Sequence, residues 1–144
     1  MSIARNVAAV VLGLIIGSIV NMGIVILGPS VIPPPAGVDV TNAESIASSM
    51  HLFEAKHFLT PFLAHALGTL VGAMVAWFVA GDRKALMAWI VGAFFLAGGI
   101  YASTVIPAPT WCMAADILLA YLPMVWLGMK LAGRIQGDNA AAGG

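Results

Sequence analysis

The sequence predicts an all-α integral membrane protein, a four-helix bundle with a short amphipathic helix in its first loop outside the cytoplasm. Sixty-one per cent of the 144 residues are hydrophobic and only 8% are charged, whereas roughly a quarter of the residues in a soluble domain carry a charge. The apolar residues fall into four blocks, each close to the ~20 residues that cross a bilayer as a helix. Few residues remain for a domain outside the membrane.

The predicted spans cover about residues 7–28, 58–80, 85–105 and 111–131 of a single domain, 1–134, and residues 135–144 are expected to form a disordered tail. The first apolar run is longer than the ~7 to 15 residues of a signal-peptide core, so we expect a retained helix. Pro61 suits the first turn of the second span, because the N–H groups there lack internal partners. Pro123 predicts a kink in the fourth span.

The segment between the first two spans is the most polar part of the chain. Pro33 to Pro35 favour an extended exit from the first span, and Thr41 with Glu44 fits a capping box that would begin a helix over residues 42–50. Ile46, Met50 and Phe53 would form one apolar edge of that segment. We expect this edge to pack onto the mouth of the bundle, with a lid over a pocket as the alternative.

The basic residues predict the orientation. Five of the six lie on one side of a four-span arrangement, and only Lys56 lies on the other; the five are Arg5, Arg83, Lys84, Lys130 and Arg134. Basic residues in short loops are retained in the cytoplasm. We therefore expect both termini to be cytoplasmic and the long loop to face outward.

Two predicted helices carry glycine faces. Gly13 and Gly17 precede Asn21 at four-residue spacing in the first span, and Gly68 and Gly72 follow His65 in the second. Small residues at this spacing allow the backbones of neighbouring membrane helices to approach closely. The faces could therefore pack within the chain, against a second copy, or against another membrane protein.

Three polar side chains are predicted at similar depth, ~7 to 12 Å below the outer boundary: Asn21, His65 and Asp116. A lone Asp within a span costs ~2.5 to 3.5 kcal/mol on insertion scales, so Asp116 needs a partner, and His65 is the obvious one. A charged rim would lie above them, formed by Glu54, Lys56 and His57. Together these six residues predict an outward-facing polar pocket that binds or helps move a small polar ligand, an ion or a lipid head group.

Other interpretations compete with this pocket. Asn21, His65 and Asp116 could form a hydrogen-bonded clasp that only holds the bundle together. A metal site is disfavoured, because the eight-residue spacing between His57 and His65 matches no ligand motif and puts the rings ~80° apart around a helix. Cys112 has no neighbouring base in sequence and no nucleophile motif is present, so we expect no catalytic residue and no cofactor. Dispersed basic residues and zero net charge argue against nucleic-acid binding.

Three segments resemble a family of small, uncharacterised four-span bacterial membrane proteins. They are KHFLTPFLAHALGTLVGA at 56–73, IPPP at 32–35 and PAPTW at 107–111. The resemblance implies four spans in the bacterial inner membrane and supplies no activity. Two functional classes thus stay open: a membrane component that binds a ligand in the outer half of the bundle, and a non-catalytic accessory or assembly subunit that docks through its glycine faces.

Overall fold

The chain is entirely helical apart from its loops and turns. The computed structural model describes residues 2–142 and contains no strand in that range. Its elements, in order, are α1 (Ser2–Val31), α2 (Ala43–Ser48), the 3-10 turns η1 (Met50–Leu52) and η2 (Ala55–Phe58), α3 (Leu59–Val79), α4 (Lys84–Val105), α5 (Thr110–Leu119) and α6 (Leu122–Ala142). Four helical segments are long and apolar enough to cross a membrane, as predicted: α1, η2 with α3, α4, and α5 with α6.

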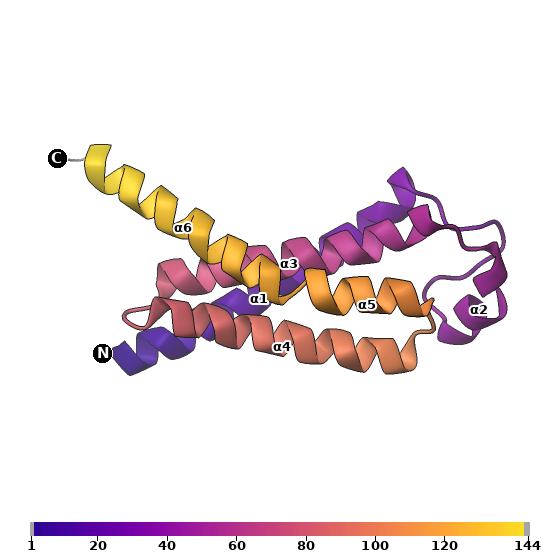
Figure 1. The fold of residues 1–144 in the computed structure, drawn as a ribbon, viewed down its shortest axis with the longest axis horizontal. Coiled ribbons are helices and arrows are strands. Elements are labelled where there is room, and N and C mark those ends of the chain that lie inside the picture. Colours follow the sequence, from indigo (N-terminus) through magenta and orange to yellow (C-terminus); the bar gives the residue numbers. More distant parts are fainter. Residues whose placement is uncertain (1, 143–144) are drawn as a thin grey trace.

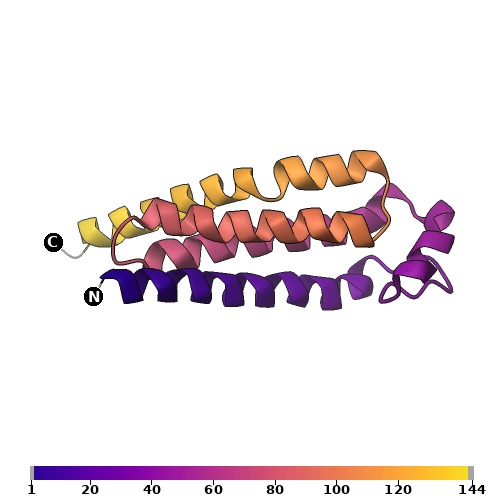
Figure 2. The same cartoon turned by 90° about the horizontal axis from the view of Figure 1, so that it is seen from below.

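These segments run side by side as an elongated bundle (Figures 1 and 2). α3 is the central helix, because it packs against α1, α4 and α6. The N-terminal end of α1, the α3–α4 turn and the C-terminal end of α6 lie at one end of the bundle (Figure 1). The segment 32–58, which contains α2, lies at the other, here called the loop end.

The glycines predicted to form packing faces pack against one another between α1 and α3. A Cβ added at Gly13 would lie 2.7 Å from the carbonyl oxygen of Gly72, and one added at Gly17 would lie 2.6 Å from that of Gly68. Added Cβ atoms at Gly68 and Gly72 would in turn meet the carbonyl oxygens of Gly17 and Gly13 at 2.9 and 2.8 Å. The two glycine faces therefore form a seam inside the chain, where only residues without side chains fit.

Small side chains fill the interface between α1 and α3, and large apolar side chains cover much of the outside. The buried residues of α3 are all small: Ala64, Ala66, Gly68, Thr69, Gly72, Ala73 and Ala76. α1 buries only Ala9, Gly13 and Gly17, while its larger residues, such as Ile15, Ile19 and Ile26, are exposed. A soluble bundle would bury these large residues instead.

The fourth span consists of two helices where one kinked helix was predicted. α5 ends at Leu119 and α6 begins at Leu122, so the interruption falls just before Pro123. Proline lacks the N–H that would bond to the carbonyl of Leu119, and its ring disfavours helical geometry in the residue before it. The helix therefore ends and restarts, and Tyr121 is buried at the break.

Two local expectations differ from the structure. α6 continues through Ala142, so a helix covers most of the predicted disordered tail 135–144; the alanines at 140–142 have high helix propensity. The short helix α2 is capped by Asn42, whose side chain accepts from the N–H groups of Glu44 and Ser45, and not by Thr41. Thr41 instead donates its hydroxyl and N–H to Asp39, and the hydroxyl bond in particular lowers the pKa of the Asp39 carboxyl.

Polar contacts join α1 to the α3–α4 turn at the end away from the loop. Arg5 Nε donates to the carbonyl of Val79, in the last turn of α3, at 2.8 Å. The Asn6 amide oxygen accepts from the N–H of Gly81 at 3.0 Å, and its nitrogen donates to Asp82. A cation at the C-terminus of α3 is favourable because that end carries unpaired carbonyls and a partial negative charge.

Candidate functional site

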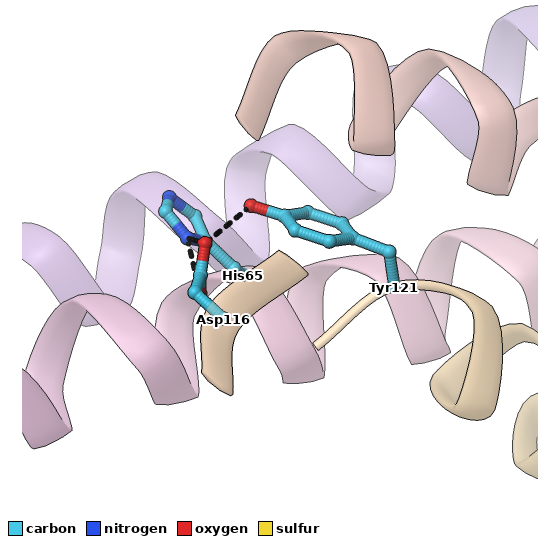
Figure 3. A network of polar contacts seen from close by, with 3 residues as sticks. All are labelled: His65, Asp116 and Tyr121. Carbon is cyan, nitrogen blue, oxygen red and sulfur yellow. Dashed lines mark hydrogen bonds and ion pairs between the residues drawn. The ribbon is translucent and has the colours of Figure 1, made fainter. Parts of the chain in front are cut away.

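The predicted contact between His65 and Asp116 is present. His65 Nδ1 on α3 lies 2.9 Å from both carboxylate oxygens of Asp116 on α5. The side chains are 27% and 16% exposed, respectively. If Asp116 is ionised, its oxygens only accept hydrogen bonds, and Nδ1 carries the hydrogen that the two groups share. The other ring nitrogen, Nε2, lies on the side of the ring away from the carboxylate (Figure 3).

Tyr121 is the third member of this network, and the sequence did not predict it. Its hydroxyl donates to Asp116 Oδ2 at 2.8 Å, and its ring lies 5.7 Å from the His65 ring, centroid to centroid (Figure 3). Tyr121 follows Asp116 by five positions, which in a regular helix places the two side chains ~140° apart. The break at residues 120–121 permits the contact. In the sequence, the feature that could have indicated this break is Pro123, which lies two residues after Tyr121.

A cavity of about 320 Å³ lies at the loop end of the bundle, and His65 and Asp116 form part of its wall. Its lining comes from the C-terminal part of α1, the 32–58 segment, the first turns of α3, the end of α4 and α5. Most lining residues are apolar, including Phe53, Phe58 and Phe62. The predicted polar pocket is thus an apolar chamber with a polar group in its wall.

The predicted charged rim contributes one residue to this cavity. His57 lines it, whereas Glu54 and Lys56 do not. Lys56 Nζ bonds to Glu54 Oε1 at 3.1 Å with both side chains largely exposed, and such surface pairs contribute little stability. Glu54 and His57 also cap η2 reciprocally: the Glu54 carboxylate accepts from the His57 N–H, and His57 Nδ1 accepts from the Glu54 N–H at 2.8 Å. His57 therefore carries its ring hydrogen on Nε2.

The apolar edge predicted for the loop takes part in the cavity as well. Ile46 of α2 and Phe53 line it, whereas Met50 does not. The chain leaves α-helical geometry at Ser49, which separates Met50 from the face of α2. The 32–58 segment thus covers the cavity at this end of the bundle.

Asn21 does not join the polar network. Its Cβ packs against Gly68, where an added Cβ would lie 2.9 Å from it, and it does not line the cavity. Its face of α1 is turned toward the glycine seam. The predicted three-residue clasp is therefore replaced by His65, Asp116 and Tyr121.

Cys112 also lines the cavity, one turn before Asp116 on α5. It is a free cysteine. Within residues 2–142 no group of three or more His, Cys, Asp or Glu side chains is arranged to hold a metal ion. The polar groups of the site are therefore suited to hydrogen bonding, as the contacts among His65, Asp116 and Tyr121 show.

Comparisons of the chain with protein-family models, with curated proteins and with solved structures give no match. The resemblance to a family of four-span bacterial membrane proteins therefore stays a prediction.

Proposed function

We propose that this chain is a multi-pass protein of the bacterial inner membrane, with both termini in the cytoplasm and the 32–58 segment outside. The four apolar helices and the large apolar side chains on their outer surfaces support insertion into lipid. The distribution of Arg5, Arg83, Lys84, Lys130 and Arg134 supports the orientation. The cavity would then lie in the outer half of the membrane.

We further propose that the cavity binds a small amphipathic molecule. The observation that carries this proposal is the His65–Asp116 pair, held by Tyr121, in the wall of an apolar cavity of about 320 Å³. Binding sites for small molecules have this composition, with apolar walls and a few convergent polar groups that fix orientation. Phe53, Phe58 and Phe62 would contact the apolar part of the ligand, and His65 its polar group.

The partial exposure of His65 separates this proposal from a purely structural clasp. A hydrogen-bonded clasp stabilises a fold most when its polar groups are buried away from water and from ligands, because hydrogen bonds are stronger there. Here Asp116 already accepts from two donors and its side chain is 16% exposed, while the His65 side chain is 27% exposed, and both line the cavity. The arrangement holds an imidazole in a fixed orientation and leaves it accessible to a ligand.

A cavity-filling substitution tests the proposal. Ala102 lines the cavity from α4, so Ala102→Phe would occupy the ligand volume. Gly98 lies one turn earlier on the same helix, and a Cβ there meets no atom within 4 Å, which makes Gly98→Phe the matched control. Each variant is extracted with native lipid in nanodiscs, and the small molecules that copurify are identified by mass spectrometry.

We expect one class of amphipathic molecule to copurify with the natural sequence and with Gly98→Phe, and to be depleted at least fivefold with Ala102→Phe. Thermal melting would confirm that all three proteins are folded. Identical lipid and small-molecule profiles for Ala102→Phe and Gly98→Phe would contradict a ligand-binding cavity.

A further inference from the structure

The hydrogen-bond roles around His65 restrict which ligand the cavity can take, and the inference drawn from them rests on the proposed binding function. Nδ1 faces both oxygens of Asp116 at 2.9 Å, and the Tyr121 hydroxyl donates to one of those oxygens. The carboxylate is therefore the acceptor for two donors. In neutral imidazole the nitrogen opposite a protonated Nδ1 carries no hydrogen and acts as an acceptor.

Nε2 is the part of this network left for a ligand. It lies on the side of the His65 ring away from Asp116 and Tyr121 (Figure 3), and no hydrogen bond from it is recorded among residues 2–142. An acceptor that lines an apolar cavity favours a partner that donates a hydrogen bond. The polar group of the ligand should therefore carry an O–H or N–H.

The charge around the cavity restricts the class further. Asp116 contributes a carboxylate, and the lining residues in the described part of the chain include no Lys or Arg. Lys56 is next in sequence to the lining residue His57, but it does not line the cavity and is paired with Glu54. A carboxylate or phosphate on the ligand would lose its hydration in the apolar cavity and would be repelled by the Asp116 carboxylate. No Lys or Arg among residues 2–142 lines the cavity to offset that cost.

We propose that His65 holds its one ring hydrogen on Nδ1, and that the ligand is an uncharged amphipathic alcohol or phenol whose hydroxyl donates to His65 Nε2 and whose apolar body fills the cavity. In this arrangement Asp116 is a positioning residue, since it fixes the tautomer that makes Nε2 an acceptor. Tyr121 holds the carboxylate in place. Anionic lipid head groups and free phosphate are excluded by the same arrangement.

Three matched probes test the ligand class in nanodiscs: para-pentylphenol, which donates a hydrogen bond; para-pentylanisole, in which a methyl ether replaces the hydroxyl; and para-pentylbenzoate, which is anionic. Binding is measured by equilibrium dialysis with empty nanodiscs subtracted. We expect the phenol to bind about fivefold more tightly than the anisole, the difference that one hydrogen bond makes, and the benzoate to bind most weakly. Ala102→Phe should remove binding of all three.

Nitrogen NMR of isotope-labelled histidine tests the tautomer independently, with the His65 signals assigned from a His65→Gln sample. We expect a protonated Nδ1 and an unprotonated Nε2 whose signal moves when the phenol is added. In Asp116→Asn the amide can donate to Nδ1 and favour the opposite tautomer, so the preference for phenol over anisole should fall toward unity. If this variant does not fold, the preference measured in the natural sequence still decides the matter.

The outcomes separate the two proposals. Equal or tighter binding of the anisole or benzoate, lost in Ala102→Phe, would overturn the alcohol or phenol assignment and leave the binding cavity standing. Binding of none of the probes above the level of empty nanodiscs would overturn both. A hydrogen on Nε2 in the natural sequence would overturn the tautomer and the donor requirement derived from it.

Discussion

At the residue scale, Asp116 illustrates how a carboxylate is accommodated within an apolar helix. It accepts from His65 on a different helix and from Tyr121 beyond a helix break. Each donor offsets part of the cost of removing the carboxylate from water. The same donors hold the carboxylate and both rings in one geometry, so removing any of them should alter both stability and the orientation of His65.

Tyr121→Phe should lower the free energy of unfolding by about 1 kcal/mol, because it removes one hydrogen bond to the part-buried Asp116 carboxylate while conserving the packed ring. Tyr101→Phe is the control, since Tyr101 is 71% exposed. Chemical unfolding in mixed detergent micelles measures both variants. Equal stabilities for Tyr121→Phe and Tyr101→Phe would show that the hydroxyl of Tyr121 contributes nothing to folding.

Two adjacent glycines of α4 provide a sharper test of the site. An added Cβ at Gly99 would overlap the Tyr121 hydroxyl, whereas one at Gly98 meets nothing within 4 Å. Gly99→Ala should therefore destabilise the protein by about 1 to 3 kcal/mol through overpacking, and Gly98→Ala should be neutral or slightly stabilising. A nitrogen NMR spectrum of Gly99→Ala should also show a changed environment at His65. Unfolding curves that coincide for the two alanine variants would contradict the close approach of Tyr121 to α4.

Single-residue reasoning from the sequence succeeded where one physical cost dominated. The penalty for a lone Asp within a span was enough to pair Asp116 with His65. It could not place Asn21, because depth along a helix says nothing about the direction in which a side chain points. It could not find Tyr121 either, since the contact depends on backbone geometry at residues 120–121 and not on regular helical spacing.

At the element scale, the α1–α3 seam fixes two of the helices that contribute to the cavity wall. Gly13 and Gly17 face Gly72 and Gly68 across a gap that admits no side chain. The glycine faces are consequently used within one chain, and docking of a second copy or another subunit would have to use other surfaces. The sequence identified the glycines of the seam but not the helix they pack against. Glycines at this spacing fit a helix of the same chain, of a second copy or of another protein equally well.

Gly17→Ala should destabilise the fold by about 1 to 3 kcal/mol, since its Cβ would press against the Gly68 carbonyl and the ring of Phe95. Gly23→Ala on the same helix is the control, because a Cβ there meets nothing within 4 Å. Unfolding in detergent measures both in the isolated protein. A Gly17→Ala variant that is as stable as Gly23→Ala yet fails to associate with other membrane proteins would instead indicate a seam between chains.

At the scale of the whole molecule, the bundle has two different ends. Arg5, Asn6 and Asp82 join α1 to the α3–α4 turn at one end, and Lys84 donates to Gln136 of α6 nearby. The other end holds the cavity, covered by the uncharged prolines and the short helix of the 32–58 segment. The sequence predicted that basic residues gather at the end away from the long 32–58 loop, and Arg5, Arg83 and Lys84 lie there, at the start of α1 and at the α3–α4 turn.

The proposed orientation predicts opposite accessibility for two engineered cysteines. In a Cys112→Ala background, Ser48→Cys would place a thiol on exposed α2 at the loop end, and Gly137→Cys would place one on the exposed C-terminal part of α6. With basic residues retained in the cytoplasm, a membrane-impermeant maleimide should label Ser48→Cys in intact cells and Gly137→Cys only after the membrane is opened. Labelling of Gly137→Cys in intact cells together with protection of Ser48→Cys would reverse the orientation. The cavity would then lie in the inner half of the membrane, and its ligand would have to come from the cytoplasmic side.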